Sequence, residues 1–277
     1  MSALKSILLH LDASPKSRSR LDIAVQLAKI HDAEVTALYA VSSVGAGYPF
    51  ASAGSPEAAA MLRDIDDANL AAAKAAFDAV AARHPAPMQW GAATIQAERF
   101  FARQARYADL MILGQHEPGK EAESSLPSDF VPWVLVESGR PGLIVPYVGI
   151  SAPIGQIAVV AWKNTREAAS ALAAALAFLR RCDRVHVVSW AEDEEFEPVG
   201  PLDIEQYLRF HGVSCTMHRN VAQPVAVGEA LLSLVADVSA DLLVAGCYGH
   251  SRAREWALGG VTRTILESMT VPVVMSH

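Results

Sequence analysis

The 277-residue chain has few cysteines, a deficit of positive charge and no long apolar run. Its three cysteines, Cys182, Cys215 and Cys247, are too few for a disulfide framework, and none belongs to a Cys-x-x-Cys pair of the kind that binds zinc. We therefore expect reduced thiols that serve as packing residues, and we predict no metal site.

The shortage of positive charge excludes other classes of protein. Lys and Arg number 23 against 30 Asp and Glu, which gives a net charge of −7. No run of Lys or Arg provides the positive field that attracts a phosphodiester backbone. The longest apolar helical stretch, residues 168–179, is too short to span a bilayer, and the N-terminal residues lack the pattern of a signal peptide. We expect a cytoplasmic protein that binds neither nucleic acid nor membranes.

The sequence does contain an internal repeat and enough apolar residues, 52%, to fill a folded core. The segment from Ala108 to Gly114 matches that from Ala240 to Gly246 at an offset of 132. Further upstream, the segment that begins at Leu11 matches the one that begins at Trp162 at an offset of 151. The first copy therefore holds about 19 extra residues, which we assign to the Gly-, Ser- and Ala-rich segment 42–56. We predict two domains, 1–149 and 153–277.

Each copy alternates predicted strands with predicted helices. Runs such as residues 241–245 are apolar on both faces, as in parallel strands that helices cover. The predicted strands are 6–11, 34–41, 89–95, 109–113 and 142–148 in the first copy, and 156–162, 184–190, 214–221, 241–245 and 271–276 in the second. We predict an α/β fold of two tandem doubly wound domains, each with a five-stranded, mainly parallel sheet and helices on both faces.

Four glycines follow the fourth strand of the second copy. Open α/β sheets bind ligands at the carboxyl ends of their strands, where Gly246 and Gly249 lie. Gly259 and Gly260 precede the last predicted helix, whose N-terminus favours an anion. Glycines at strand ends often only form turns, but four at fixed spacing in a repeated α/β unit favour a phosphate-binding loop.

The spacing Gly-x2-Gly-x9-Gly, followed by a small residue and then Val261 and Thr262, resembles the ATP-binding signature of the universal stress protein family. The tandem arrangement and the Val-Pro-Val-Val run of the last strand resemble that family too. The resemblance spans nearly the whole chain, although only the second copy has the glycine motif. It implies a Rossmann-like, adenine nucleotide alpha hydrolase-like fold, ATP as a ligand and a role in stress regulation. It also implies that the two last strands meet in an intrachain pseudo-dimer, and it leaves a further homodimer open.

The resemblance places the nucleotide site on residues of the second copy: Gly246, Gly249, His250, Gly259, Gly260, Val261, Thr262 and Lys163. ATP-binding members carry Asp at the end of the first strand, as this chain does at Asp12, whereas the second copy has Lys163 there. That lysine either neutralises phosphate or is a solvated loop residue, and the sequence leaves open whether Mg²⁺ accompanies the nucleotide. In the first copy Glu117 replaces the second glycine, so we expect no nucleotide there.

No pattern of residues assigns a catalytic group, so we expect ATP hydrolysis to be slow or absent. The sequence favours a stress-response regulator that binds ATP or a related nucleotide through its C-terminal domain. The alternative is a stress adaptor that binds no nucleotide, keeps a vestigial glycine loop and acts through protein contacts.

Overall fold

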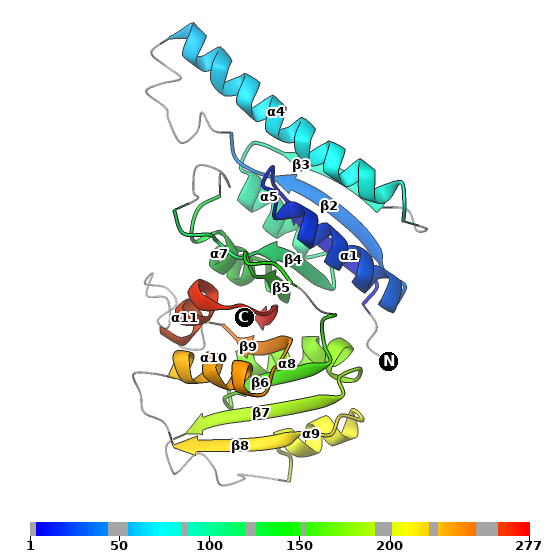
Figure 1. The fold of residues 1–277 in the computed structure, drawn as a ribbon, viewed down its shortest axis with the longest axis vertical. Coiled ribbons are helices and arrows are strands. Elements are labelled where there is room, and N and C mark those ends of the chain that lie inside the picture. Colours follow the sequence, from blue (N-terminus) through cyan, green and yellow to red (C-terminus); the bar gives the residue numbers. More distant parts are fainter. Residues whose placement is uncertain are drawn as a thin grey trace. The chain divides into compact units, whose positions relative to one another are not determined.

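A computed structural model describes residues 4–43, 55–84, 88–119, 126–150, 153–191, 201–221, 227–247 and 260–277. Two compact units divide the chain, Leu4–Arg140 and Pro141–His277. Each unit is an α/β sandwich with helices on both faces of its sheet (Figure 1).

The first unit has four parallel strands in the order β3-β2-β1-β4. Helix α1 packs against α4, and α5 packs against α7. The elements in chain order are β1 (Ser6–Leu11), α1 (Ser17–His31), β2 (Glu34–Ala40), α4 (Pro56–Ala81), β3 (Met88–Ala93), α5 (Ala97–Ala105), β4 (Leu110–Gly114) and α7 (Phe130–Ser138).

The second unit has six strands in the order β5-β10-β9-β6-β7-β8, of which β5 alone runs antiparallel to its neighbour. Helix α8 packs on β6, β9 and β10, and α10 packs against α11. Its elements are β5 (Gly142–Val145), β6 (Ile157–Trp162), α8 (Arg166–Leu179), β7 (Arg184–Ala191), α9 (Ile204–Phe210), β8 (Thr216–Val221), α10 (Val227–Asp237), β9 (Leu242–Gly246), α11 (Gly260–Ser268) and β10 (Val273–Ser276). Each copy of the repeat thus contributes five strands, which confirms the predicted fold class.

One aspartate in each copy has the same structural role, which accounts for part of the repeated sequence. Asp109 accepts hydrogen bonds from the backbone N–H groups of Lys5 and Ser6, which begin the first strand of the first unit. Asp241 accepts in the same way from residues at the start of β6, including Gln156. Both carboxylates satisfy backbone donors that the parallel ladder leaves open. The Ala-Asp motif therefore joins the start of one strand to the start of its neighbour in each copy.

The extra length of the first copy lies mainly in a helix, which corrects the assignment to segment 42–56. Helix α4 has 26 residues, whereas its counterpart α9 has 7. Ser55 caps α4 through a side-chain bond to the N–H of Ala58, and Pro56 suits the first helical position. The alanine-rich sequence after this cap has high helix propensity, so the added residues extend a helix rather than a loop.

The last strands of the two copies pair with each other, as predicted. β5 and β10 are antiparallel, with Leu143 opposite Val274. All four residues of each strand are buried. Strand β5, although it ends the first copy in sequence, is therefore part of the second compact unit. Among the described residues, no helix has the length and apolar character needed to span a bilayer.

Candidate functional site

A cavity of about 320 Å³ opens in the second unit at the carboxyl ends of β6, β7 and β9. It is lined by Ala161, Trp162, Lys163, Thr165, Glu167, Ala168, Trp190, Val227, Leu231, Ala245, Gly246, Gly260, Val261 and Thr262. Its walls are therefore mostly apolar, with a small number of polar groups, as in many small-molecule sites.

Two helix N-termini border the cavity. Helix α8 begins after Thr165, whose hydroxyl accepts from the N–H of Ala168, and its first turn lines one wall. Helix α11 begins at Gly260, and its first turn lines another wall through Val261 and Thr262. The free N–H groups and the dipole of each helix start favour negative charge. In the described part of the chain, the cavity thus has two sources of positive potential besides Lys163.

Gly246, which ends β9, packs so closely against α8 that no larger residue would fit there. A Cβ at this position would lie 2.6 Å from the backbone nitrogen of Ala168 and 2.7 Å from the carbonyl carbon of Glu167. Because both atoms belong to the backbone of α8, no side-chain rotation could relieve the contact. The glycine lets β9 end directly against the first turn of α8.

Among the described residues that line the cavity, the charged groups are one exposed cation and one buried anion. Lys163 follows β6 directly and is exposed, whereas Glu167 is 4% exposed. Arg166 donates from Nε to Glu167 at 2.5 Å. Burial alone would raise the pKa of Glu167, but hydrogen bonds, that from Arg166 first among them, hold this pKa below its usual range. A carboxylate therefore faces any anion that enters.

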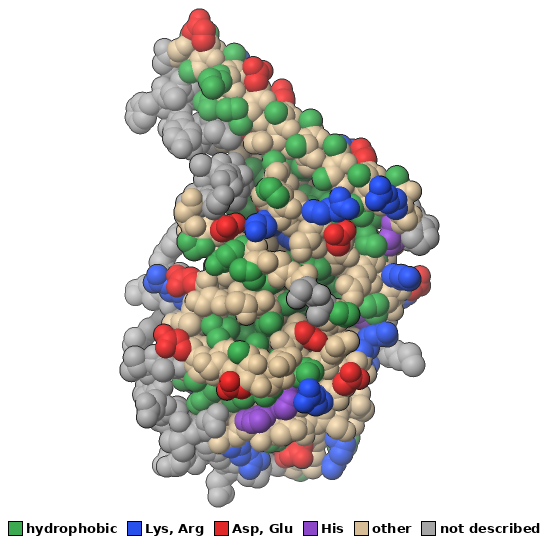
Figure 2. All heavy atoms as spheres, in the orientation of Figure 1, with side chains coloured by type: hydrophobic (Ala, Val, Ile, Leu, Met, Phe, Trp, Pro, Cys, Tyr) green, Lys and Arg blue, Asp and Glu red, His purple; other side chains and the backbone are tan. Residues whose placement is uncertain are grey.

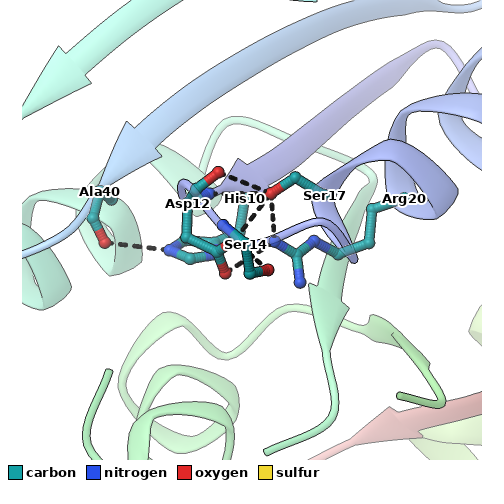
Figure 3. A network of polar contacts seen from close by, with 6 residues as sticks. All are labelled: His10, Asp12, Ser14, Ser17, Arg20 and Ala40. Atoms are coloured by element: carbon teal, nitrogen blue, oxygen red, sulfur yellow. Dashed lines mark hydrogen bonds and ion pairs between the residues drawn. The ribbon is translucent and has the colours of Figure 1, made fainter. Parts of the chain in front are cut away.

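The first unit has a closed polar network at the equivalent place (Figure 3). Asp12 follows β1 directly, and its Oδ2 lies 2.7 Å from Nη2 of Arg20. Both side chains are buried, at 2% and 4% exposure. Ser14 and Ser17 donate their hydroxyls to Oδ1 of Asp12. Burial alone would raise the pKa of Asp12, but Arg20 first, and then His10 and the two serines, outweigh it and lower this pKa to about 2.

Arg20 also occupies the space beside Gly114, the glycine that ends β4. A Cβ on Gly114 would collide with Nη1 of Arg20. The second unit lacks most of this network, because at the offset of 151 Asp12 corresponds to Lys163, Ser17 to Ala168 and Arg20 to Ala171, whereas Ser14 corresponds to Thr165, which keeps a hydroxyl. Small residues thus stand in the second unit where the first has a hydroxyl and a guanidinium.

Solved structures provide the comparison that identifies the fold. The chain is similar to a universal stress protein from Archaeoglobus fulgidus DSM 4304, with a TM-score of 0.67 and 16% sequence identity over 98% of this chain and 97% of that one. The chain has the universal stress protein fold. A functionally unknown protein from Pseudomonas aeruginosa PAO1 is also similar, with a TM-score of 0.58 and 15% identity over 99% of this chain and 92% of that one. No family model and no curated protein matches the sequence.

Within this universal stress protein fold, five of the predicted site residues line the one cavity. They are Lys163, Gly246, Gly260, Val261 and Thr262. The remaining three, Gly249, His250 and Gly259, lie outside the described residues. Lys163 and Asp12 occupy equivalent positions in the two copies, and each lies directly after the first strand of its copy.

Sequence reasoning missed several residues that line the cavity. Trp162 ends β6 and Trp190 is the last but one residue of β7. The rule that ligands bind at carboxyl strand ends would have found both had it been applied to every strand. Glu167 was missed because a charged residue in the first turn of a helix is usually solvated. Val227 and Leu231 come from α10, and only the packed structure shows that they reach the cavity.

His10 lies beside the closed network of the first unit and has no exposed surface. Its ring contacts the rings of Phe101 and Phe130. Its Nε2 lies 2.9 Å from the carbonyl oxygen of Ala40, and its Nδ1 is buried without a hydrogen-bond partner in the described part of the chain. Burial first, and then the charge of Arg20, lower the pKa of His10 from 6.5 to about 4.

We expect this histidine to make the protein less stable as the pH falls from 6.5 to about 4. In that window the unfolded chain binds a proton that the folded protein excludes, so the free energy of unfolding decreases, by roughly 3 kcal/mol in total. Urea unfolding at about pH 7 and about pH 4.5 measures the effect. His10→Phe, which keeps an aromatic ring in the site, should flatten the dependence, and an unchanged slope in that variant would assign it to other groups.

Proposed function

We propose that the second unit binds ATP or a related nucleotide in this cavity, and that the protein is a stress-response regulator of the universal stress protein kind. The observation that carries the proposal is that two helix N-termini and Lys163 surround one cavity at the carboxyl ends of parallel strands. Phosphates are the anions that such helix starts commonly bind. The nucleotide site would belong to the predicted domain 153–277, and the domain 1–149 would lack one.

The lining suggests how such a nucleotide would lie. The phosphates would meet the first turn of α11, at Gly260 and Thr262, with Lys163 beside them. The base would contact the apolar wall that Trp162 and Trp190 provide, because aromatic rings and nucleobases stack favourably. The carboxylate of Glu167 would repel the phosphates. We therefore expect Glu167 to accept a hydrogen bond from a donor on the ribose or the base. We assign no catalytic residue.

In the first unit, the equivalent place is already occupied by the unit's own polar side chains. Its carboxylate, Asp12, already has Arg20, Ser14 and Ser17 as partners, and the Arg20 side chain fills the space beside Gly114. A ribose hydroxyl or a metal ion would have to displace a buried ion pair. This supports a single nucleotide site in the chain.

Lys163→Asp should weaken ATP binding in EDTA and regain affinity when Mg²⁺ is added. The substitution removes a charge-assisted contact to phosphate, worth ~1.5–3 kcal/mol or roughly 10- to 150-fold in the dissociation constant. It also supplies a carboxylate that can hold Mg²⁺. Isothermal titration calorimetry measures the affinity, and the fluorescence of Trp162 and Trp190 gives a second readout of the same cavity.

Two controls sharpen the test. Lys163→Gln should show the loss in EDTA without rescue by Mg²⁺, because glutamine brings no charge. Lys5→Asp, in the first unit, should bind as the parent does. Equal affinity of Lys163→Asp and the parent in both buffers would mean that Lys163 is a solvated loop residue. A parent protein that binds no nucleotide would favour the alternative of an adaptor that acts through protein contacts.

A further inference from the structure

Glu167 is the one Asp or Glu among the described residues that line the cavity of the second unit. It lies in the first turn of α8 and is buried, with 4% of its surface exposed. Acidic side chains are usually solvated, and Figure 2 shows them at the surface on one face of the molecule. A buried carboxylate in the wall of a mostly apolar cavity is therefore placed to recognise a specific group of a ligand.

The protein itself supplies some, but not all, of the hydrogen bonds that this carboxylate can accept. Nε of Arg166 lies 2.5 Å from Oε1 of Glu167. Burial opposes ionisation of Glu167, but Arg166, the N–H of Glu167 itself and the side chain of Thr165 outweigh it through hydrogen bonds and lower its pKa. A carboxylate has about four lone-pair positions. These three partners thus leave room for a further donor from the cavity.

The place of Glu167 in the cavity favours the ribose of a nucleotide as the source of that donor. A Cβ on Gly246 would lie 2.7 Å from the carbonyl carbon of Glu167, so Glu167 lies at the end of β9. The strands run in the order β10-β9-β6-β7, with α11 leading into β10 and Trp190 near the end of β7. Phosphates at the start of α11 and a base against Trp190 would therefore lie on either side of Glu167. The ribose is the part of a nucleotide that joins them.

The two copies hold a buried carboxylate at this edge of the sheet in different ways. In the first copy it is Asp12, which forms an ion pair with Arg20, and both side chains are buried. In the second copy Lys163 takes the position of Asp12, and the buried carboxylate is Glu167, four residues later. Its cation, Arg166, has a side chain that is 82% exposed, so solvent weakens this pair. The second copy thus keeps a carboxylate without the buried arginine that closes the first.

We propose that Glu167 accepts a hydrogen bond from one ribose hydroxyl and thereby makes the site selective for ribonucleotides over their deoxy counterparts. The inference rests on the proposed nucleotide site. Carboxylates at the strand ends of other open α/β sheets accept from ribose hydroxyls in this way. The loss of one hydrogen bond to a charged group lowers affinity by roughly 10- to 150-fold.

Calorimetric titration of the full-length protein with ATP, 2′-deoxy-ATP and 3′-deoxy-ATP tests the proposal. One of the two deoxynucleotides should bind roughly 10- to 150-fold more weakly than ATP. Glu167→Met, which keeps an unbranched side chain but has no carboxylate, should bind all three alike. Inosine triphosphate has a carbonyl oxygen where adenine has its amine, so it separates recognition of the base from that of the ribose. Glu167→Met should leave the affinity for inosine triphosphate relative to ATP unchanged.

Glu229→Met is the matched control. Glu229 also lies in the first turn of a helix of the second unit, α10, but it is exposed and does not line the cavity. This variant should discriminate among the nucleotides as the parent does, and circular dichroism checks that both variants are folded.

The outcomes separate this inference from the nucleotide site on which it rests. Equal affinity of the parent for ATP and both deoxynucleotides would overturn the role of Glu167 and leave the nucleotide site in place. A preference for ATP that persists in Glu167→Met would assign the ribose contact to another residue. A change in the relative affinity for inosine triphosphate would assign Glu167 to the base. A parent that binds none of the nucleotides would overturn the nucleotide site itself.

Discussion

Replacing Arg20 by alanine should reduce the free energy of unfolding by about 3–5 kcal/mol, the largest effect that we expect from any single substitution. The guanidinium lies 2.7 Å from Asp12, and both side chains are almost completely buried. Its removal leaves a carboxylate in a protein interior without its cation, and the two serines cannot replace the lost charge. Urea denaturation of the parent and the variant at neutral pH measures the difference.

Arg18→Ala is the control, because Arg18 lies on the same helix and pairs with Asp22 at 58% and 63% side-chain exposure. Exposed pairs of this kind contribute about 0–1 kcal/mol. Adding Asp12→Asn to Arg20→Ala should recover part of the loss, since no unpaired charge then remains. Equal losses in Arg18→Ala and Arg20→Ala would contradict the importance of the buried pair.

Gly246→Ala should destabilise the protein by ~1–3 kcal/mol or more, because a methyl group must displace the backbone of α8. The atoms that it meets, at 2.6 and 2.7 Å, belong to Ala168 and Glu167. At Gly260 an added Cβ meets no atom of the described residues within 4 Å, so Gly260→Ala should leave stability almost unchanged. Thermal unfolding of the two variants, measured side by side without nucleotide, compares them.

The comparison separates two explanations for the glycines of the motif. If Gly246 is present only to admit phosphate, both variants should unfold like the parent in the absence of nucleotide. A loss in Gly246→Ala alone means that this glycine serves the packing of β9 against α8. Similar losses in both variants would contradict the packing argument.

The sequence predicted the strands and their repeat well because the determinants are local and occur twice. Buried parallel strands are continuous apolar runs, and the Ala-Asp motif recurs because Asp109 and Asp241 bind the starts of neighbouring strands. The paired last strands followed from a family resemblance rather than from periodicity. The roughly 19 extra residues of the first copy were assigned to the loop before α4, whereas they lengthen α4 itself relative to α9.

The site was harder to predict because its properties depend on residues brought together from separate elements. Nothing near Arg20 in sequence shows that it turns inward from α1 to meet Asp12, since most helical arginines are solvated. Trp190 reaches the cavity of Lys163 only because β7 pairs with β6 in one register. The glycine spacing indicated the edge of the sheet at which the cavity opens, but it carried no information about the apolar wall or the buried Glu167.

The antiparallel pairing of β5 with β10 has a consequence for how the protein responds to dilution. Two separate chains that met through such strands would come apart as their concentration fell, whereas strands in one polypeptide have a fixed effective concentration. Tandem duplication thus makes this contact independent of how much protein a cell contains. The same linkage means that a fragment beginning after β5 would present the apolar strand β10 as a bare edge, which is a template for aggregation.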